Sequence, residues 1–185
     1  SLHPHGYNIT LEKIKNYKQK KILFVGGSNL GFGLSSKKIE DSLGVKTFNL
    51  GVHGGIGIKK PIEDISEYLN SNDIVIFSPE YSNFDLNHYS DVKNRVRFFN
   101  GIGFLKIKDV KSFFHYIEHI KTKVFYYGSI QEHQYNINWL NESGDVIYHY
   151  NKQNRPFSLK FSNDNVNTNL LKELKSFIES KLNGI

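Results

Sequence analysis

Apolar-rich runs alternate with amphipathic segments over the first 78 residues of the chain. The runs at 21–25, 45–50 and 73–78 have the length and composition of short, buried strands. Between them, apolar residues recur at helical spacing over 35–43 and 61–70. The pattern predicts the order strand, helix, strand, helix, strand.

This alternation predicts parallel strands joined by right-handed crossovers, with helices on both faces of one open sheet. The fold class is therefore α/β, and the expected arrangement is a flavodoxin-like, three-layer α/β/α domain. In such sheets, ligands bind beyond the carboxyl ends of the strands. Three unusual sequences, GGSN, GVHGG and PEYSNF, follow these ends. We therefore expect three loops to meet at one site.

Both ends of the chain are predicted to be helical. Apolar residues over 8–19 indicate a short, charged amphipathic helix, so residues 1–20 form a lead-in to a single domain that spans 21–185. The clearest amphipathic helix in the sequence covers 170–182. A doubly wound domain would continue with a further strand and helix, so we expect the domain to be incomplete at its C-terminus.

The segment between these helices has a less regular pattern. A helix is predicted at 110–120 and a strand at 123–127. Residues 139–150 have the pattern of two strand-like pieces joined by a turn at 141–145. We therefore expect a β-hairpin insertion within about 123–162.

Composition indicates one globular domain with an aromatic core. Hydrophobic residues occupy 38% of the 185 positions, and 14 Phe and 11 Tyr supply enough apolar area for one core. The formal net charge is +6, but the lysines are dispersed among nearly as many acids, which argues against nucleic acid as a partner. The sequence contains no cysteine, which excludes disulfides, thiolate metal sites and cysteine nucleophiles.

The sequence contains no candidate membrane span. Its apolar runs are all shorter than the roughly 18 residues that a span needs. The sequence begins with Ser and lacks Met, so we expect an upstream part, such as a membrane anchor, to be missing from it. Contact with a membrane is expected only through such an anchor.

A single serine lies among glycines in KILFVGGSNLGFG, directly after the first predicted strand. Such a turn could bind phosphate, but a P-loop would end in Lys followed by Ser or Thr, and the dinucleotide fingerprint has glycine where Ser36 stands. The nucleophile elbow of α/β-hydrolases has glycine in place of Leu30. What remains is Ser28 at the start of a helix, where the helix dipole favours the negative charge that develops in acyl transfer.

Three motifs in order resemble those of the SGNH (GDSL-like) hydrolase superfamily. GGSN resembles the first block, with Gly27 in place of the family's aspartate. FNLGVHGG has the N-x-G-x-x-G form of the second block, at Asn49, Gly51 and Gly54, and PEYSNF is similar to the third block, with Asn83 as its asparagine. The motifs are most similar to a divergent branch found in bacterial surface-polysaccharide gene clusters, and LNESGDVIYHY is a further similarity to that branch.

The resemblance, which covers residues 21–84, implies the roles of three residues. Ser28 would be the nucleophile, and the oxyanion would be held by the backbone amides of Ser28 and Gly51 and the side chain of Asn83. Each such donor is typically worth about 3 kcal/mol of the barrier. The implied function is a serine esterase or O-acyltransferase that acts on a carbohydrate through an acyl-serine intermediate, without cofactor or metal. The implied location is outside the bacterial cytoplasmic membrane or associated with it, with a cytoplasmic location as the alternative.

Such a serine needs a general base, which the family takes from an Asp-x-x-His segment near the end of the domain. Asp85 and His88 have that spacing but directly follow the third motif. His53 lies close to Gly51 in sequence and is a second candidate. Otherwise the base lies beyond residue 185, or the chain is a catalytically inactive relative.

Simpler interpretations of the same residues remain open. Ser28 could cap the following helix, and Glu80 could be an active-site acid or a salt-bridged loop carboxylate. His115 and His119 have the spacing of a metal-binding pair on a helix but lack a third ligand. Two alternative functions follow: an inactive SGNH-like module that binds glycans, and a flavodoxin-like binder of nucleotide or phosphate that uses the amides of residues 26–29.

Overall fold

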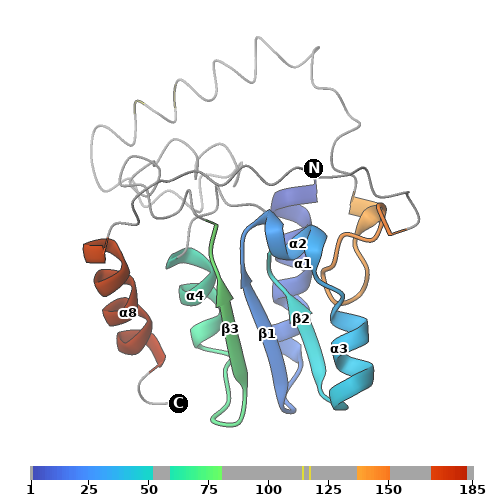
Figure 1. The fold of residues 1–185 in the computed structure, drawn as a ribbon, viewed down its shortest axis with the longest axis horizontal. Coiled ribbons are helices and arrows are strands. Elements are labelled where there is room, and N and C mark those ends of the chain that lie inside the picture. The colour runs from blue at the N-terminus through green and yellow to red at the C-terminus, as the bar shows by residue number, and fades with distance from the viewer. Residues whose placement is uncertain are drawn as a thin grey trace.

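In the computed structural model, the described residues are 2–51, 59–80, 114, 117, 137–150 and 168–182 (Figure 1). Their helices and strands are α1 Leu2–Asn16, β1 Lys21–Gly26, α2 Ser28–Gly33, α3 Ser36–Leu43, β2 Lys46–Asn49, α4 Lys59–Ser66, β3 Ile74–Ser78, the 3-10 helix η4 Ile137–Trp139, and α8 Thr168–Leu182. Phe114 and Ile117 are helical, as expected for 110–120. Several residues with predicted roles lie outside the described residues, as does the strand expected at 123–127. These residues are His53, Gly54, Asn83, Asp85, His88, His115 and His119.

The three predicted strands form one parallel sheet, in the order β2-β1-β3. In the register of the central strand, Ile22 lies opposite Thr47 of β2 and Ile74 of β3. The residues of β1 are buried from Lys21 to Val25, which explains its uninterrupted apolar run. The α/β class and the parallel sheet are confirmed.

Alternate residues of β1 contribute to two apolar clusters, because successive side chains of a strand point to opposite faces. Leu23 and Val25 pack with residues of α1, β2, α4 and α8. Ile22 and Phe24 pack with Leu30 of α2 and with the partly buried Leu34, Ile39 and Val45, of which Ile39 lies in α3. Figure 1 shows α4 and α8 on the β3 side of the sheet and α3 on the β2 side.

The N-terminal helix α1 belongs to the core of the sheet. Its residues Tyr7, Leu11 and Ile14 are buried in the cluster that contains Leu23 and Val25. The Tyr7 hydroxyl donates to Asp64 Oδ2 at 2.7 Å. Burial, and then the neighbouring carboxylate of Asp64, raises the pKa of the Tyr7 hydroxyl well above its ordinary value. The helix expected to lead into the domain therefore packs directly on it.

The other predicted helices are found close to their expected positions. The helix expected at 35–43 is α3, and Gly44 ends it in the left-handed conformation with a φ of 65°. The helix expected at 61–70 is α4, which begins earlier and ends at Ser66. The C-terminal helix expected at 170–182 is α8.

The predicted hairpin at 139–150 retains its turn but not its two strands. The flanking pieces reduce to one antiparallel bridge, between Leu140 and Val146. The Asn141 side chain accepts the backbone N–H groups of Ser143 and Asp145, each at 2.9 Å. These side-chain bonds support the tight turn. The backbone ladder beside it ends after two bonds, because η4 lies on one side of the bridge and a further turn, from Ile147 to Tyr150, lies on the other.

A buried ion pair joins the first residue of β1 to the residue before β3. Lys21 Nζ lies 2.6 Å from Asp73 Oδ2, and the two side chains are 0% and 1% exposed. Asp73 also accepts the backbone N–H groups of Lys21 at 3.0 Å and of Asn70 at 2.8 Å. The Asp73 carboxylate thus neutralises the buried charge of Lys21 and accepts hydrogen bonds from two backbone N–H groups.

We expect Asp73→Ala to lower the free energy of unfolding by about 3–5 kcal/mol, because it leaves the Lys21 ammonium buried without its partner. Urea denaturation of the folded chain measures this loss. The control is Asp41→Ala, which breaks the exposed pair with Lys37 on α3. Surface pairs contribute little, so the control should unfold close to the parent midpoint. Equal midpoints for the two variants would contradict the expected role of the buried pair.

Candidate functional site

Three predicted loops begin at the same edge of the sheet, because β1, β2 and β3 are parallel. Ser28 follows β1, Gly51 follows β2 and Glu80 follows β3. Figure 1 shows α2, which begins at Ser28, at the end of β1. The expected convergence of the loops is therefore present for their first residues.

Ser28 is hydrogen-bonded to the carboxylate of Glu80. The Ser28 hydroxyl donates to Glu80 Oε1 at 2.7 Å, and the Ser28 backbone N–H donates to the same oxygen at 2.5 Å. Both contacts are partly buried. The residue that caps α2 is Gly27, in an extended conformation, so Ser28 is the first residue of the helix and not its cap. The Ser28 hydroxyl is thus oriented by an ionisable group from the third loop.

Glycines let these loops approach one another. A Cβ on Gly27 would lie 2.3 Å from Glu80 Oε1, so a side chain there would displace the carboxylate. A Cβ on Gly51 would lie 2.3 Å from Leu30 Cβ and 2.7 Å from the carbonyl oxygen of Gly27. The backbone of the second loop therefore lies directly against the turn that carries Ser28.

The Gly51 N–H, a predicted oxyanion donor, has an acceptor within the chain. It donates to Asn49 Oδ1 at 2.9 Å, and Asn49 is fully buried. The Ser28 N–H is likewise engaged, by Glu80. The third predicted donor, Asn83, lies outside the described residues. The structure therefore brings Ser28 and Gly51 together, with both N–H groups hydrogen-bonded to side chains.

A buried polar network lies beneath this edge. Asn49 Nδ2 donates to Asp145 Oδ1 at 2.9 Å and to the Leu30 carbonyl oxygen at 3.0 Å. Asp145 Oδ1 also accepts the Ser36 hydroxyl at 2.7 Å, and Oδ2 accepts the Ser36 N–H at 2.8 Å and Asn141 Nδ2 at 2.9 Å. Four donors thus converge on one carboxylate that is fully buried.

The network holds the 137–150 segment against β2 and α2. The Asn49 N–H donates to the Ser143 carbonyl at 2.7 Å, and the Val146 N–H donates to the Gly31 carbonyl at 2.9 Å. Gly144 has a φ of 95°, and a Cβ there would lie 2.3 Å from the carbonyl oxygen of Asn49. No local motif predicts a role for Asp145, and only its place in the turn of LNESGDVIYHY could have indicated one.

His149 lies near α2 and is a second residue that sequence reasoning did not select. Its ring packs on Phe32, one helical turn after Ser28, with 5.6 Å between ring centroids, and on Tyr150 at 5.0 Å. Its Nδ1 atom is buried and lacks a hydrogen-bond partner within the described part of the chain. Among those same residues, no three histidines or carboxylates gather as a metal site would require.

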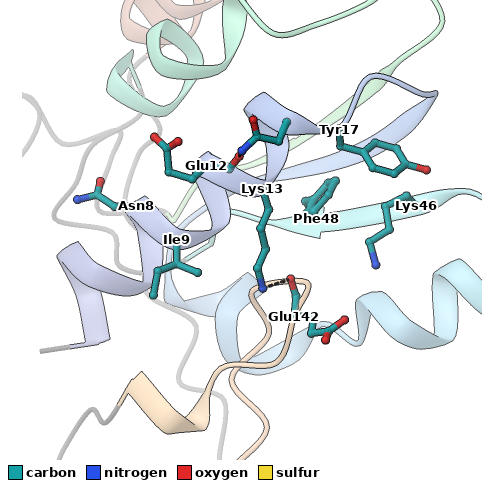
Figure 2. A pocket seen from close by; sticks show the side chains of 9 residues that line it. Asn8, Ile9, Glu12, Lys13, Tyr17, Lys46, Phe48 and Glu142 are labelled. Atoms are coloured by element: carbon teal, nitrogen blue, oxygen red, sulfur yellow. Dashed lines mark hydrogen bonds between the residues drawn. The ribbon is translucent and has the colours of Figure 1, made fainter.

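A separate hollow of about 980 Å³ lies between α1, β2 and Glu142 (Figure 2). Its two lysines have partners: Lys13 Nζ donates to the Glu142 carbonyl at 3.0 Å, and Lys46 pairs with Glu40 at 3.0 Å. Its apolar wall includes Phe48, which is only 2% exposed. The candidate residues Ser28, Gly51 and Glu80 do not line this hollow.

Comparison with protein-family models, curated proteins and solved structures found no match for the chain. None of the helices in the described ranges is long and apolar enough to cross a membrane.

The contact between the first two loops gives a matched pair of glycine variants within α2. A Cβ on Gly31 would lie 2.1 Å from the Gly51 carbonyl oxygen, whereas a Cβ on Gly33 would meet nothing within 4 Å. We expect Gly31→Ala to cost about 1–3 kcal/mol of stability, because backbone would have to move. Gly33→Ala should be neutral or slightly stabilising. Thermal unfolding of both variants checks this, and equal melting temperatures would contradict the packing of Gly31 against Gly51.

Proposed function

We propose that the chain is a serine esterase or O-acyltransferase of the SGNH-like type, with Ser28 as its nucleophile. The observation that carries the proposal is the 2.7 Å hydrogen bond from the Ser28 hydroxyl to a carboxylate, at the edge of the sheet where three loops begin. Nucleophilic serines depend on a neighbouring group that accepts their proton. The motifs GGSN, FNLGVHGG and PEYSNF add the expectation of an acylated carbohydrate, such as a surface polysaccharide, or an acylated small molecule as substrate.

The proposed reaction passes through an acyl-serine. Ser28 Oγ attacks the ester carbonyl carbon, the alcohol leaves, and water or an acceptor hydroxyl then takes the acyl group from the serine. The N–H groups of Ser28 and Gly51 and the side chain of Asn83 are the proposed oxyanion donors. Because Gly51 N–H donates to Asn49 Oδ1 and Ser28 N–H to Glu80, both groups would exchange these partners for the oxyanion as it forms.

The whole domain is inferred to be flavodoxin-like, with helices in layers on both sides of the sheet. The apolar clusters on the two faces of β1 support this arrangement. In such a domain, the edge that carries Ser28 is the usual place for a ligand.

One observation favours a second candidate, an inactive module that binds glycans. Glu80 Oε1 accepts the Ser28 N–H, which is the position that an oxyanion would occupy. The same carboxylate argues against the third candidate, a phosphate or nucleotide binder, since its negative charge would repel a phosphate at the amides of residues 26–29.

A fluorophosphonate probe tests the proposal, because it forms a stable adduct only with an activated serine. The whole chain is treated with the probe and weighed by mass spectrometry, and the labelled peptide is then sequenced. We expect one adduct, on Ser28. If the folded protein takes up no probe, the binding module replaces the enzyme as the best interpretation, and stabilisation by an oligosaccharide becomes its test.

A further inference from the structure

Among the described residues at the site, one ionisable side chain, that of Glu80, is hydrogen-bonded to Ser28. It is therefore a candidate for the general base that the sequence did not identify. We propose that Glu80 is the general base, which takes the Ser28 proton during attack and returns it to the leaving group. This inference rests on the proposed function and assigns a further catalytic residue to the same site.

Geometry supports the assignment of Glu80. Its Oε1 atom lies 2.7 Å from Ser28 Oγ, within the range in which a proton can pass directly. The carboxylate is held at this position by the Ser28 N–H, and Gly27 leaves room for its side chain. His149 packs on Phe32 instead, and no hydrogen bond joins its side chain to Ser28 in the described structure.

The first half of the reaction balances with these two residues alone. As Ser28 Oγ forms its bond to the carbonyl carbon, its proton moves to Glu80 Oε1 and the carbonyl π electrons move to the oxygen. When the intermediate collapses, the carbonyl re-forms, the bond to the alcohol oxygen breaks, and Glu80 gives its proton to that oxygen. The carboxylate is then restored beside an acyl-serine.

The second half runs through the same carboxylate. Water or the acceptor hydroxyl gives its proton to Glu80 as its oxygen attacks the acyl carbon. Ser28 Oγ then leaves and takes the proton back, so both residues return to their starting states. No oxidant, reductant or further reactant is needed.

The hydrogen bond from the Ser28 N–H to Glu80 is consistent with this reaction scheme. Before attack, the Glu80 carboxylate carries the negative charge, and the Ser28 N–H stabilises it. In the intermediate Glu80 is neutral, and the single negative charge lies on the oxyanion. The N–H can then donate to the oxyanion, because protonated Glu80 is a weaker acceptor. Glu80 and the oxyanion are thus never negatively charged at the same time.

The decisive variant is Glu80→Gln, whose carbonyl oxygen can still accept both Ser28 donors but cannot take up a proton. We expect the rate of fluorophosphonate labelling to fall at least about 100-fold, the usual lower limit for loss of a general base. Its melting temperature should remain near that of the parent chain. Glu80→Asp, which keeps a carboxylate on a shorter stem, should label at an intermediate rate and serves as a second test if Glu80→Gln unfolds.

His149→Gln is the matched control, and it should label at the parent rate. Undiminished labelling of Glu80→Gln at Ser28 would overturn the role of Glu80 and leave the proposed function standing. A large loss in His149→Gln with none in Glu80→Gln would assign the base to His149 instead. Absence of labelling in the folded parent chain would overturn the proposed function, and the role of Glu80 with it.

Discussion

Ser28→Ala is expected to abolish acyl transfer, with the hydrolysis of an activated aryl acetate falling on the order of 1,000-fold or more. Alanine removes the attacking oxygen but leaves the backbone N–H that donates to Glu80. The variant loses one side-chain hydrogen bond, which is worth about 1.5–3 kcal/mol when the acceptor is charged. It should therefore remain folded. Initial rates and a thermal melt of the same preparation separate the loss of chemistry from the loss of structure.

The control for this variant is Ser42→Ala, on α3. The Ser42 hydroxyl donates to the Lys38 carbonyl within its own helix and is exposed. Its removal should change neither the hydrolysis rate nor the labelling of Ser28. If Ser28→Ala kept the parent rate, the turnover would have to come from another nucleophile, and the proposed role of Ser28 would be wrong.

Asp145→Ala is expected to produce a large loss of stability, about 3–5 kcal/mol. The substitution removes the common acceptor of Ser36, Asn49 and Asn141, and of these donors only Asn49 Nδ2 keeps another hydrogen bond within the described residues, to the Leu30 carbonyl. An unsatisfied buried donor costs about 1–3 kcal/mol, and the four costs are not additive because the network relaxes as a unit. Chemical denaturation monitored through Trp139 fluorescence measures the loss, since Trp139 lies in the same segment.

Asp145→Asn should be nearly as damaging as alanine. Both carboxylate oxygens accept donors, so whichever way the amide is turned, its NH₂ group faces other N–H or O–H groups. Glu142→Ala, an exposed change in the same turn, is the control and should leave the unfolding midpoint almost unchanged. If Asp145→Asn were as stable as the parent chain, Asp145 could not be the charged acceptor that the network requires.

Much of the fold could be predicted from the sequence because its regular elements have strong periodic patterns. β1 is a continuous apolar run because both of its faces are covered, and α3 ends where Gly44 allows a positive φ. The helix α2 was not bounded in advance, because SNLGFG is too short and too rich in glycine to show a helical period. The strands expected at 139–150 are reduced to one bridge because the 3-10 helix η4 and a turn from Ile147 to Tyr150 interrupt the ladder on either side, which hydrophobic alternation does not reveal.

The site could be predicted only where the position of a residue next to a predicted strand defines its place in the fold. The position of Ser28 and Gly51 after parallel strands placed them at one edge. The bond between Ser28 and Glu80 depends on how β1 and β3 align, which no local pattern specifies. The pairing of Asn49 with Asp145 joins residues 96 positions apart, so it follows from the folded arrangement and not from either motif.

The ion pair of Lys21 with Asp73 and the hydrogen bond of Ser28 with Glu80 span the same sequence separation, 52 residues. They lie at opposite ends of the paired strands β1 and β3. Each strand therefore has the same number of residues between the ion pair and the hydrogen bond. A slip of one residue would move Glu80 by about 3.3 Å, farther than a hydrogen bond can stretch. The ion pair of Lys21 with Asp73, at the other end of the strands, thus helps to fix the register in which Glu80 reaches Ser28. Insertions between the strands can be absorbed by loops, whereas a residue added within β3 would separate the serine from its carboxylate.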